Sequence, residues 1–377
     1  MTGTRVLFLP LSNVLGHLAR TFALAEKLFE YNAEVHIAAC DHYNTLFHVL
    51  PEEIVIHPSI EMPPDSSRSF GKIVSFEEGE EHDIRNLNSA NDLSSEEMQI
   101  RVDFLRKMVE QDEALIQKLK PDVIITDYRY TILNMNITEN VRVFHISNFL
   151  GFPSFYNRVR GQLFLPLNQD TVLVPGIASL EEVEQEFSSQ NANVHWCGHF
   201  NWKGWKRLKK ENSNQSKIDV FLSFGSTGNA QNLVPWLIEN IDLNYSLLTA
   251  MDTEHAQGDR ENVHSEQFGS LEQSLMRSRV VCCHGGHGTV MESILHERPM
   301  IIFPNNLEQL EIGRRIEKLG LGVLINKPQE EITTDQLNKT IEDVLCNAYM
   351  KEKLAHYARC IKASDGTENA VKIILKK

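Results

Sequence analysis

The chain has 377 residues, of which 42% are hydrophobic and 23% charged, a composition typical of a globular protein. This length exceeds what one ordinary hydrophobic core organises and predicts two domains. The formal net charge of −14 at pH 7 argues against nucleic-acid binding through a broad basic face and against strong electrostatic attachment to anionic lipids.

The cysteines and the apolar runs exclude two further classes of protein. The six cysteines are dispersed and include no Cys-x-x-Cys pair, so we expect no zinc site and a reducing, cytoplasmic location. No apolar run approaches the ~20 residues that a membrane-spanning helix needs, so no transmembrane segment is expected.

The first half of the chain alternates short apolar runs with amphipathic stretches, which predicts parallel strands joined by helices. Strands are expected at residues 6–9, 34–40, 122–126, 141–146, 172–174 and 194–197, and helices at 17–31 and 100–119. Residues 51–97 are rich in proline, serine and acidic residues and predict a long mobile excursion. Residues 148–161 resist assignment.

Residues 199–217 lose the apolar periodicity and carry a run of lysines, which predicts a solvated linker. A second alternation follows, with strands expected at 219–224, 245–250, 280–283 and 300–303, and helices at 232–239, from about 288, at 337–345 and from 349 onward. The predicted organisation is an N-terminal domain over 1–198, a linker over 199–217, a C-terminal domain over 218–360 and a terminal helix over 361–377.

A glycine-rich turn follows the predicted strand at 280–283 and opens the next helix. Glycines let backbone N–H groups approach a ligand, and the first turn of a helix offers unbonded N–H donors and the positive end of the helix dipole. A diphosphate fits such a turn without a lysine or a metal. We therefore predict a diphosphate site formed by the amides of Gly286 and Gly288, the hydroxyl of Thr289 and the imidazole of His284.

Three further polar residues suit hydroxyl groups of the ligand that carries the diphosphate. Glu292 lies three residues after Thr289, on the same side of the predicted helix, and suits a ribose diol. Glu308 and Gln309 follow the next strand and suit sugar hydroxyls.

This pattern resembles the donor-binding signature of family 1 glycosyltransferases, the GT-B enzymes that use nucleotide-diphosphate sugars, and MurG-like enzymes share the layout. The resemblance implies that His284 and Thr289 hold the diphosphate, Glu292 the ribose, and Glu308 and Gln309 the sugar. It also implies an α/β GT-B fold, with two Rossmann-like domains facing across a cleft and a terminal helix that crosses back to the first domain. This chain departs from the pattern in having Glu308 where Asp is usual, and His287 where Trp or Ala is common.

His17 and Asp127 are the predicted catalytic pair. His17 follows Gly16 after the first strand, and Asp127 ends another strand at the same edge of the sheet. A neutral imidazole can remove a proton near pH 7, and a carboxylate on its other nitrogen fixes the tautomer. The family resemblance implies the same two roles. The alternatives are that His17 caps its own helix or packs in the loop, and that Asp127 caps a helix or forms a surface ion pair.

Three donor-site candidates have weaker support. Ser226 and Thr227 lie in a predicted strand-turn-helix and could offer hydroxyls and amides to the diphosphate, although the same letters suit a plain tight turn. Phe268, with Gln267 before it, falls where the backbone of the family meets the base, although an ordinary strand is an equal interpretation.

The expected function is inverting, metal-independent transfer of a sugar from a UDP- or dTDP-sugar to a hydroxyl of a hydrophobic small molecule, as in natural product glycosylation. No cofactor or metal is expected, because the chain has no Asp-x-Asp pair for a divalent ion. The alternatives are a GT-B sugar-nucleotide epimerase and a non-catalytic nucleotide-sugar-binding protein. Segments 60–95 and 148–162 are expected to form the acceptor pocket, and a monomer and a homodimer both stay open.

Overall fold

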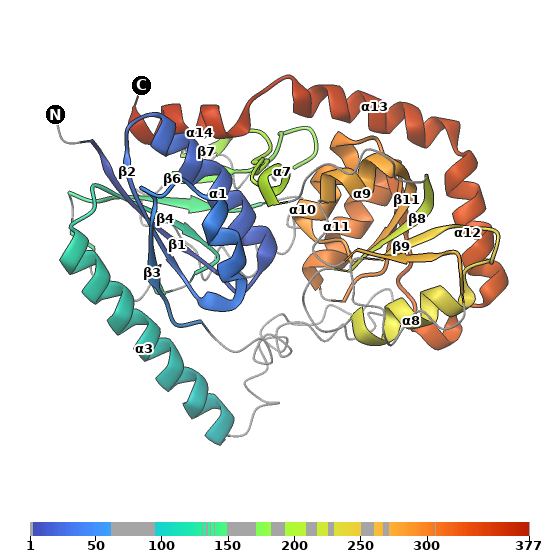
Figure 1. Ribbon diagram of the computed structural model, residues 1–377, viewed down its shortest axis with the longest axis horizontal. Helices are drawn as coiled ribbons and strands as arrows, with labels where there is room; N and C mark the ends of the chain where they lie inside the picture. The colour runs from blue at the N-terminus through green and yellow to red at the C-terminus, as the bar shows by residue number, and fades with distance from the viewer. Residues whose placement is uncertain are drawn as a thin grey trace. The chain divides into compact units, whose positions relative to one another are not determined.

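The computed structural model describes residues 3–61, 95–129, 131–132, 135, 137–138, 140–148, 171–181, 193–208, 217–224, 230–249, 260–266, 271–305 and 307–376. These residues form two compact units (Figure 1). The first unit contains the described residues up to Leu208 and those from Ser364 onward, and the second contains the described residues from 217 to Ala363.

The described residues of the first unit contain a parallel sheet of seven strands in the order β3-β2-β1-β4-β5-β6-β7. The strands are β1 (Arg5–Pro10), β2 (Glu34–Ala39), β3 (Val55–Pro58), β4 (Val123–Asp127), β5 (Arg142–Ile146), β6 (Thr171–Val174) and β7 (Val194–Trp196). Their continuous apolar runs reflect burial on both faces of a parallel sheet. Six of these strands were predicted, whereas β3 lies in the stretch that was predicted to be an excursion without strands.

Helices cover both faces of this sheet. On one face, α1 (Leu15–Glu30) lies alongside α14 (Gly366–Leu375), and both pack on a core that contains Val6 and Phe8 (Figure 1). On the other face, α3 (Ser95–Leu119) packs on a core that contains Leu7 and Leu9. The alternation of side chains along β1 therefore feeds two separate cores. The first unit also contains the 3₁₀ segment η1 (Asp41–Val49) and the short helix α7 (Trp205–Leu208).

The described residues that precede and follow the second unit in the sequence take part in the core of the first unit. Phe200 and Trp202, from the stretch predicted as linker, are buried in the core beneath α1. Val371 and Ile374 of α14 lie in the same core, and the side-chain amide of Asn369 donates to the carbonyl oxygen of Cys197 at 2.8 Å.

The described residues of the second unit contain a parallel sheet of six strands in the order β10-β9-β8-β11-β12-β13. The strands are β8 (Ile218–Ser223), β9 (Leu247–Thr249), β10 (Val263–Ser265), β11 (Ser278–Cys283), β12 (Met300–Ile302) and β13 (Gly322–Leu324). The four strands predicted with the central apolar runs are confirmed. β10 and β13 were missed.

The helical segments of the second unit are α8 (Ala230–Asn240), α9 (Leu271–Arg277), α10 (His287–Leu295), α11 (Leu307–Lys318), η5 (Gln329–Glu331), α12 (Thr334–Cys346) and α13 (Ala348–Lys362). α12 begins with a capping box, in which Thr333 and Gln336 bond reciprocally. α11 was not predicted, and it carries both Glu308 and Gln309.

The two sheets share one topology, in which the first strand of each sheet lies between its second and fourth strands. Strand order therefore reverses beside the first strand of each sheet. The loops that follow β1 and β4 in the first sheet diverge at its carboxyl edge, and so do the loops that follow β8 and β11 in the second sheet. Ligands of open α/β sheets bind at such switch points. His17 follows β1 and Asp127 is the last residue of β4, both in the first sheet. His284 follows β11 in the second sheet.

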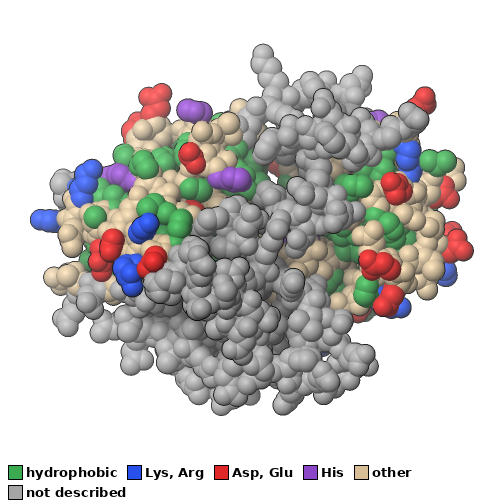
Figure 2. Space-filling view, turned by 90° about the horizontal axis from the view of Figure 1, so that it is seen from below, with side chains coloured by type: hydrophobic (Ala, Val, Ile, Leu, Met, Phe, Trp, Pro, Cys, Tyr) green, Lys and Arg blue, Asp and Glu red, His purple; other side chains and the backbone are tan. Residues whose placement is uncertain are grey.

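None of the helices among the described residues combines the length and the apolar character that crossing a membrane requires. On the face shown in Figure 2, acidic and basic side chains of the described residues are interspersed over both units and gather into no large basic patch.

Candidate active site

His17 and Asp127 meet at the switch point of the first sheet. Asp127 is the last residue of β4 and pairs in register with Pro10 of β1. The amide of Leu11 then donates to the carbonyl oxygen of Asp127 at 2.8 Å, and α1 begins at Leu15. His17 therefore lies in the first turn of α1, beside the end of β4.

The imidazole of His17 bonds to the carboxylate of Asp127, with 2.8 Å between Nδ1 and Oδ1. The His17 side chain is 16% exposed and the Asp127 side chain 2%. Because the carboxylate holds one ring nitrogen, Nε2 is the nitrogen that can exchange a proton with a substrate. The N-cap of α1 is Val14 and not His17, and Asp127 is buried and does not lie on the surface.

Arg20 joins this pair and was missed by the sequence analysis. Its Nη2 donates to Asp127 Oδ1 at 2.5 Å, and its Nε donates to Oδ2, so the guanidinium holds the carboxylate in a fork. The same Nη2 lies 2.7 Å from Nδ1 of His17. A sequence signal existed: Arg20 follows His17 by three residues on a predicted amphipathic helix, a spacing that makes the two side chains neighbours on the helix surface.

Asp127 stays ionised in this setting. Burial alone would raise the pKa of its carboxyl, but the positive charge of Arg20, the proximity of His17 and the hydrogen bonds from both outweigh burial and lower the pKa to about 2. The carboxylate is therefore charged throughout the physiological range.

Tyr128 completes the surroundings of the base. Its ring centroid lies 4.6 Å from that of His17, with a 47° angle between the planes, and the guanidinium carbon of Arg20 lies 5.7 Å from the Tyr128 ring centroid. Tyr128 has a φ of +57°, in the left-handed region, which directs the chain sharply away from the end of β4.

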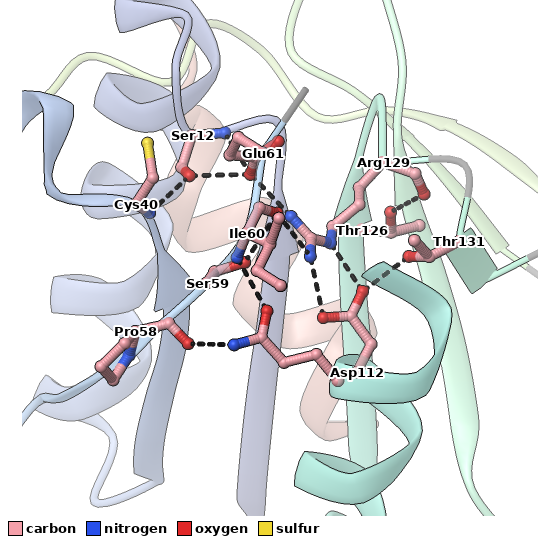
Figure 3. Close-up of polar contacts among 11 residues, drawn as sticks. Ser12, Cys40, Pro58, Ser59, Ile60, Glu61, Asp112, Thr126, Arg129 and Thr131 are labelled. Atoms are coloured by element: carbon pink, nitrogen blue, oxygen red, sulfur yellow. Dashed lines mark hydrogen bonds and ion pairs between the residues drawn. The ribbon is translucent and has the colours of Figure 1, made fainter. Parts of the chain in front are cut away.

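A second buried polar group occupies the same edge of the first sheet, and we call Ser12, Glu61, Asp112, Arg129 and Thr131 the Arg129 cluster (Figure 3). The fully buried Arg129 donates to Asp112 through Nε at 2.7 Å and through Nη2 at 2.9 Å, and to Glu61 Oε1 through Nη1 at 2.6 Å. Thr131 Oγ1 donates to Asp112 Oδ2 at 2.7 Å.

The Arg129 cluster ties together segments that are distant in the sequence. Ser12 Oγ, just after β1, donates to Glu61 Oε1 at 2.8 Å and accepts from the amide of Cys40 at 2.9 Å. Burial raises the pKa of Glu61, against the opposing effects of Arg129 and Ser12. The cluster therefore holds the segment that leads from β1 into α1. No short-range sequence pattern indicates it, because the bonded residues are 17 to 68 positions apart.

In the second unit, the glycine-rich turn has the geometry of a helix amino end. β11 ends at Cys283, and α10 begins at His287 with Gly286 as its N-cap, which makes no side-chain capping bond. The first α-helical bond of this turn runs from the amide of Val290 to the carbonyl of Gly286 at 3.0 Å. The amides of residues 287–289 precede that bond and present the positive end of the helix dipole.

His284 lies over this helix end. A Cβ built on Gly286 would stand 2.5 Å from Nε2 of His284, so the imidazole occupies the space above the N-cap. Burial lowers the pKa of His284 to about 4, and the nearby Ser223 carbonyl and Glu308 carboxylate oppose the shift only in part. The ring is therefore neutral at pH 7, and its buried Nδ1 has no hydrogen-bond partner in the described structure.

Gly285 shapes the turn for a steric reason. Its φ is +87°, and an added Cβ would lie 2.9 Å from Cγ2 of Ile302 and 3.1 Å from the carbonyl oxygen of Gln309. Only glycine fits such a conformation and such a close approach.

The remaining predicted donor-site residues occupy α10 and α11. Glu292 lies one turn beyond Thr289, with its Oε2 3.6 Å from Nε2 of His296. Glu308 lies in the first turn of α11, close enough to His284 to affect its pKa. Gln309 is largely buried, and its Oε1 accepts from the amide of Asn305 at 2.8 Å.

Gln309 Oε1 is thus used to brace the turn before α11, which the sequence analysis did not foresee. The structure brings His284, the Gly286–Thr289 turn and Glu308 together at one sheet edge. Ser226, Thr227, Gln267 and Phe268 lie outside the described residues, as do residues 62–94 and 149–162 of the expected acceptor loops. Within the described ranges no group of three or more His, Cys, Asp and Glu side chains has an arrangement that could hold a metal ion.

A protein-family model matches a stretch that lies mostly in the second unit. Residues 241–369 match the family model described as the glycosyltransferase family 28 C-terminal domain. The sequence motifs resemble those of family 1, whereas the family model that matches is that of family 28.

Two curated relatives agree with this match. A protein of Bacillus subtilis named "Uncharacterized UDP-glucosyltransferase YojK" is 30% identical over 102 residues, which cover 27% of this chain and only 25% of that protein. A "PGL/p-HBAD biosynthesis glycosyltransferase" of Mycobacterium tuberculosis is 21% identical over 400 residues, which cover 92% of this chain and 86% of that protein.

A solved structure shows the fold of the whole chain. "Spinosyn Rhamnosyltransferase SpnG complexed with thymidine diphosphate" superposes with a TM-score of 0.67 at 18% sequence identity, covering 99% of this chain and 100% of that one. The predicted GT-B fold with two Rossmann-like domains is confirmed by this likeness and by the two parallel sheets. The family match, the named relatives and the fold together identify the chain as a glycosyltransferase of the GT-B type.

Proposed function

We propose that the protein transfers a sugar, with inversion at C1, from a UDP- or dTDP-sugar to a hydroxyl of a hydrophobic small molecule, and that the transfer needs no metal or other cofactor. The observation that carries the proposal is the 2.8 Å contact between His17 Nδ1 and Asp127 Oδ1 at the switch point of the first sheet. This contact gives His17 the partner that a general base needs.

The proposed chemistry begins at the acceptor hydroxyl. Its proton moves to Nε2 of His17 as its oxygen attacks C1 of the sugar from the face opposite the leaving group, through a transition state with oxocarbenium character. The bond between C1 and the diphosphate oxygen breaks, and its electron pair leaves with the diphosphate. The Asp127 carboxylate stabilises the imidazolium that forms on His17.

The departing diphosphate needs stabilisation of its growing negative charge. We assign this role to the amides of Gly286, Gly288 and neighbouring residues at the start of α10, assisted by the Thr289 hydroxyl and the His284 ring. The buried Nδ1 of His284 without a partner supports a ligand here, since leaving a buried polar atom unbonded costs about 1–3 kcal/mol. Metal-independent transfer is supported by the lack of an Asp-x-Asp pair in the sequence.

Further assignments follow the motif. Glu292 is proposed to bind the ribose, and Glu308 and Gln309 the sugar, with Gln309 contributing its amide N–H₂ because its Oε1 bonds to Asn305. Ser226, Thr227 and Phe268 stay predictions of contacts to the donor. Both nucleotides belong in the donor test, since one relative is named a UDP-glucosyltransferase and the SpnG structure holds thymidine diphosphate.

His17→Ala tests the proposal. We expect transfer to fall by at least about a hundredfold, the lower end of a general-base contribution, while UDP or dTDP binding stays within about twofold of wild type. Transfer is measured by mass spectrometry with UDP- and dTDP-sugars over a panel of hydroxylated aromatic and macrocyclic acceptors, and binding by calorimetry. The control is His264→Ala, at an exposed histidine of β10.

Transfer near the wild-type rate in His17→Ala would remove His17 as the base. The epimerase alternative is tested by incubating the protein with a nucleotide sugar and no acceptor, and following the sugar by NMR. An epimerase would change the sugar without an acceptor. Donor binding with no turnover on any acceptor would instead favour a non-catalytic binding protein.

A further inference from the structure

Two groups meet at one ring nitrogen of His17. Asp127 Oδ1 lies 2.8 Å from Nδ1, and Arg20 Nη2 lies 2.7 Å from the same atom. A ring nitrogen carries either a proton or an acceptor lone pair. Nδ1 therefore cannot donate to the carboxylate and accept from the guanidinium at the same time.

The choice between these partners decides what Nε2 can do. If Nδ1 donates to Asp127, Nε2 of the neutral ring carries the lone pair and can take a proton from an acceptor hydroxyl. If Nδ1 accepts from Arg20, the proton of the neutral ring sits on Nε2 and no proton can be taken there.

The charges of Arg20 and Asp127 also affect whether His17 takes up a proton. The guanidinium of Arg20 is always protonated and holds both oxygens of Asp127. The negative charge of Asp127 is thus balanced before His17 takes up a proton, so protonation changes the net charge of the three side chains from zero to +1. Without Arg20 it would change from −1 to zero, which a buried site favours.

Arg20, Asp127 and Tyr128 face the His17 ring from two different parts of the first unit. Arg20 belongs to α1, whereas Asp127 ends β4 and Tyr128 follows it. Arg20 is 8% exposed and Asp127 2%, so solvent screens their interaction little. The Tyr128 ring lies against the His17 ring in a tilted arrangement, and the Arg20 guanidinium lies over the Tyr128 ring.

We propose that Arg20 is a positioning residue: by donating to both oxygens of Asp127 it keeps His17 uncharged between turnovers, with the proton of the neutral ring on Nδ1 and the lone pair on Nε2. The inference rests on the proposed role of His17 as the base and adds a role for a residue outside the family signature described above. Arg20 opposes formation of a resting imidazolium–carboxylate pair, so His17 stays available as a base at lower pH than a histidine beside Asp127 alone.

The variants Arg20→Met and Arg20→Lys test this role. In Arg20→Met, the acidic limb of the pH profile of kcat/KM should move to higher pH by about one unit or more, because the buried carboxylate then favours the charged ring. Arg20→Lys retains the charge and should show a smaller shift. The control is Arg106→Met, at a mostly exposed arginine of α3, which should leave the profile unchanged.

A spectroscopic measurement reads the same effect without activity. In protein labelled with ¹⁵N-histidine, the two ring-nitrogen shifts of His17 report its tautomer and its titration, with His17→Ala used to assign the signals. We expect His17 of Arg20→Met to titrate at higher pH than in wild type and its neutral form to carry the proton on Nδ1.

An equal loss of rate at every pH, with an unchanged titration of His17, would show that Arg20 only supports the fold and would overturn the inference. If Arg20→Met does not fold, the comparison of Arg20→Lys with wild type decides by the same two readouts. Failure of His17→Ala to abolish transfer removes the proposed base, whereas an unmoved His17 titration in the Arg20 variants removes only the role of Arg20.

Discussion

Two glycines of the turn before α10 differ in what a methyl group would meet. A Cβ on Gly286 would stand 2.5 Å from the His284 ring, whereas a Cβ on Gly288 would meet no atom of another described residue within 4 Å. Packing of the protein itself therefore accounts for glycine at 286. At 288 the protein leaves space beside the first turn of a helix, where a diphosphate would need close approach to the backbone.

Gly288→Ala separates ligand binding from stability. The added methyl group should leave the stability unchanged or raise it by up to about 1 kcal/mol, because alanine favours the helix. The affinity for UDP and dTDP should fall at least about tenfold, equivalent to about 1.4 kcal/mol, since the methyl group stands where the diphosphate is proposed to lie. Calorimetric titration and thermal unfolding measure the two quantities.

Gly16→Ala is the matched control for this change. A Cβ on Gly16 also meets no atom within 4 Å among the described residues, and Gly16 likewise lies in the first turn of a helix. The control should bind both nucleotides with wild-type affinity. An unaltered affinity in Gly288→Ala as well would place the diphosphate elsewhere.

At the scale of elements, the Arg129 cluster joins the first unit across its sheet edge. Ser12 leads out of β1, Glu61 follows β3, Asp112 belongs to α3 and Arg129 follows β4. One guanidinium balances two buried carboxyls, so its removal leaves charge in the interior without compensation (Figure 3).

Arg129→Met should therefore destabilise the protein by about 3–5 kcal/mol, the range observed when one partner of a buried ion pair is removed. Chemical denaturation followed by tryptophan fluorescence measures the loss. Arg106→Met, on the exposed side of α3, should change the stability by less than about 0.5 kcal/mol. Equal stability of the two variants would show that the cluster contributes little to the fold.

At the scale of the whole molecule, buried titratable groups link stability to pH. His284 has a pKa of about 4 in the folded protein, whereas an unfolded histidine titrates near 6.5. Between these values the unfolded chain binds more protons than the folded one, so stability falls as the pH falls. Asp127, with its pKa lowered to about 2, contributes a further loss as the pH falls below 3.8.

His284→Asn should reduce the decline of unfolding free energy between pH 6.5 and 4, because asparagine has no proton to bind. Urea denaturation at several pH values checks this slope. A decline of the same steepness in wild type and variant would mean that His284 is not the buried neutral group described here.

The sequence by itself determined the features that depend on local periodicity. Continuous apolar runs predicted most of the parallel strands, and the glycines before Val290 predicted the start of α10 to within one residue. The positions of His17 after β1, Asp127 at the end of β4 and His284 after β11 followed from strand order alone, because parallel strands end at one edge of a sheet.

Only the tertiary structure decided which distant side chains pair. Arg20 pairs with Asp127 across 107 positions, and Glu61 pairs with Arg129 across 68. β3, β10 and β13 are strands only because a neighbouring strand offers them hydrogen bonds. Apolar periodicity records which face of a segment is buried, but the partner of a buried charge depends on which strands become neighbours, and that is settled when the sheet assembles.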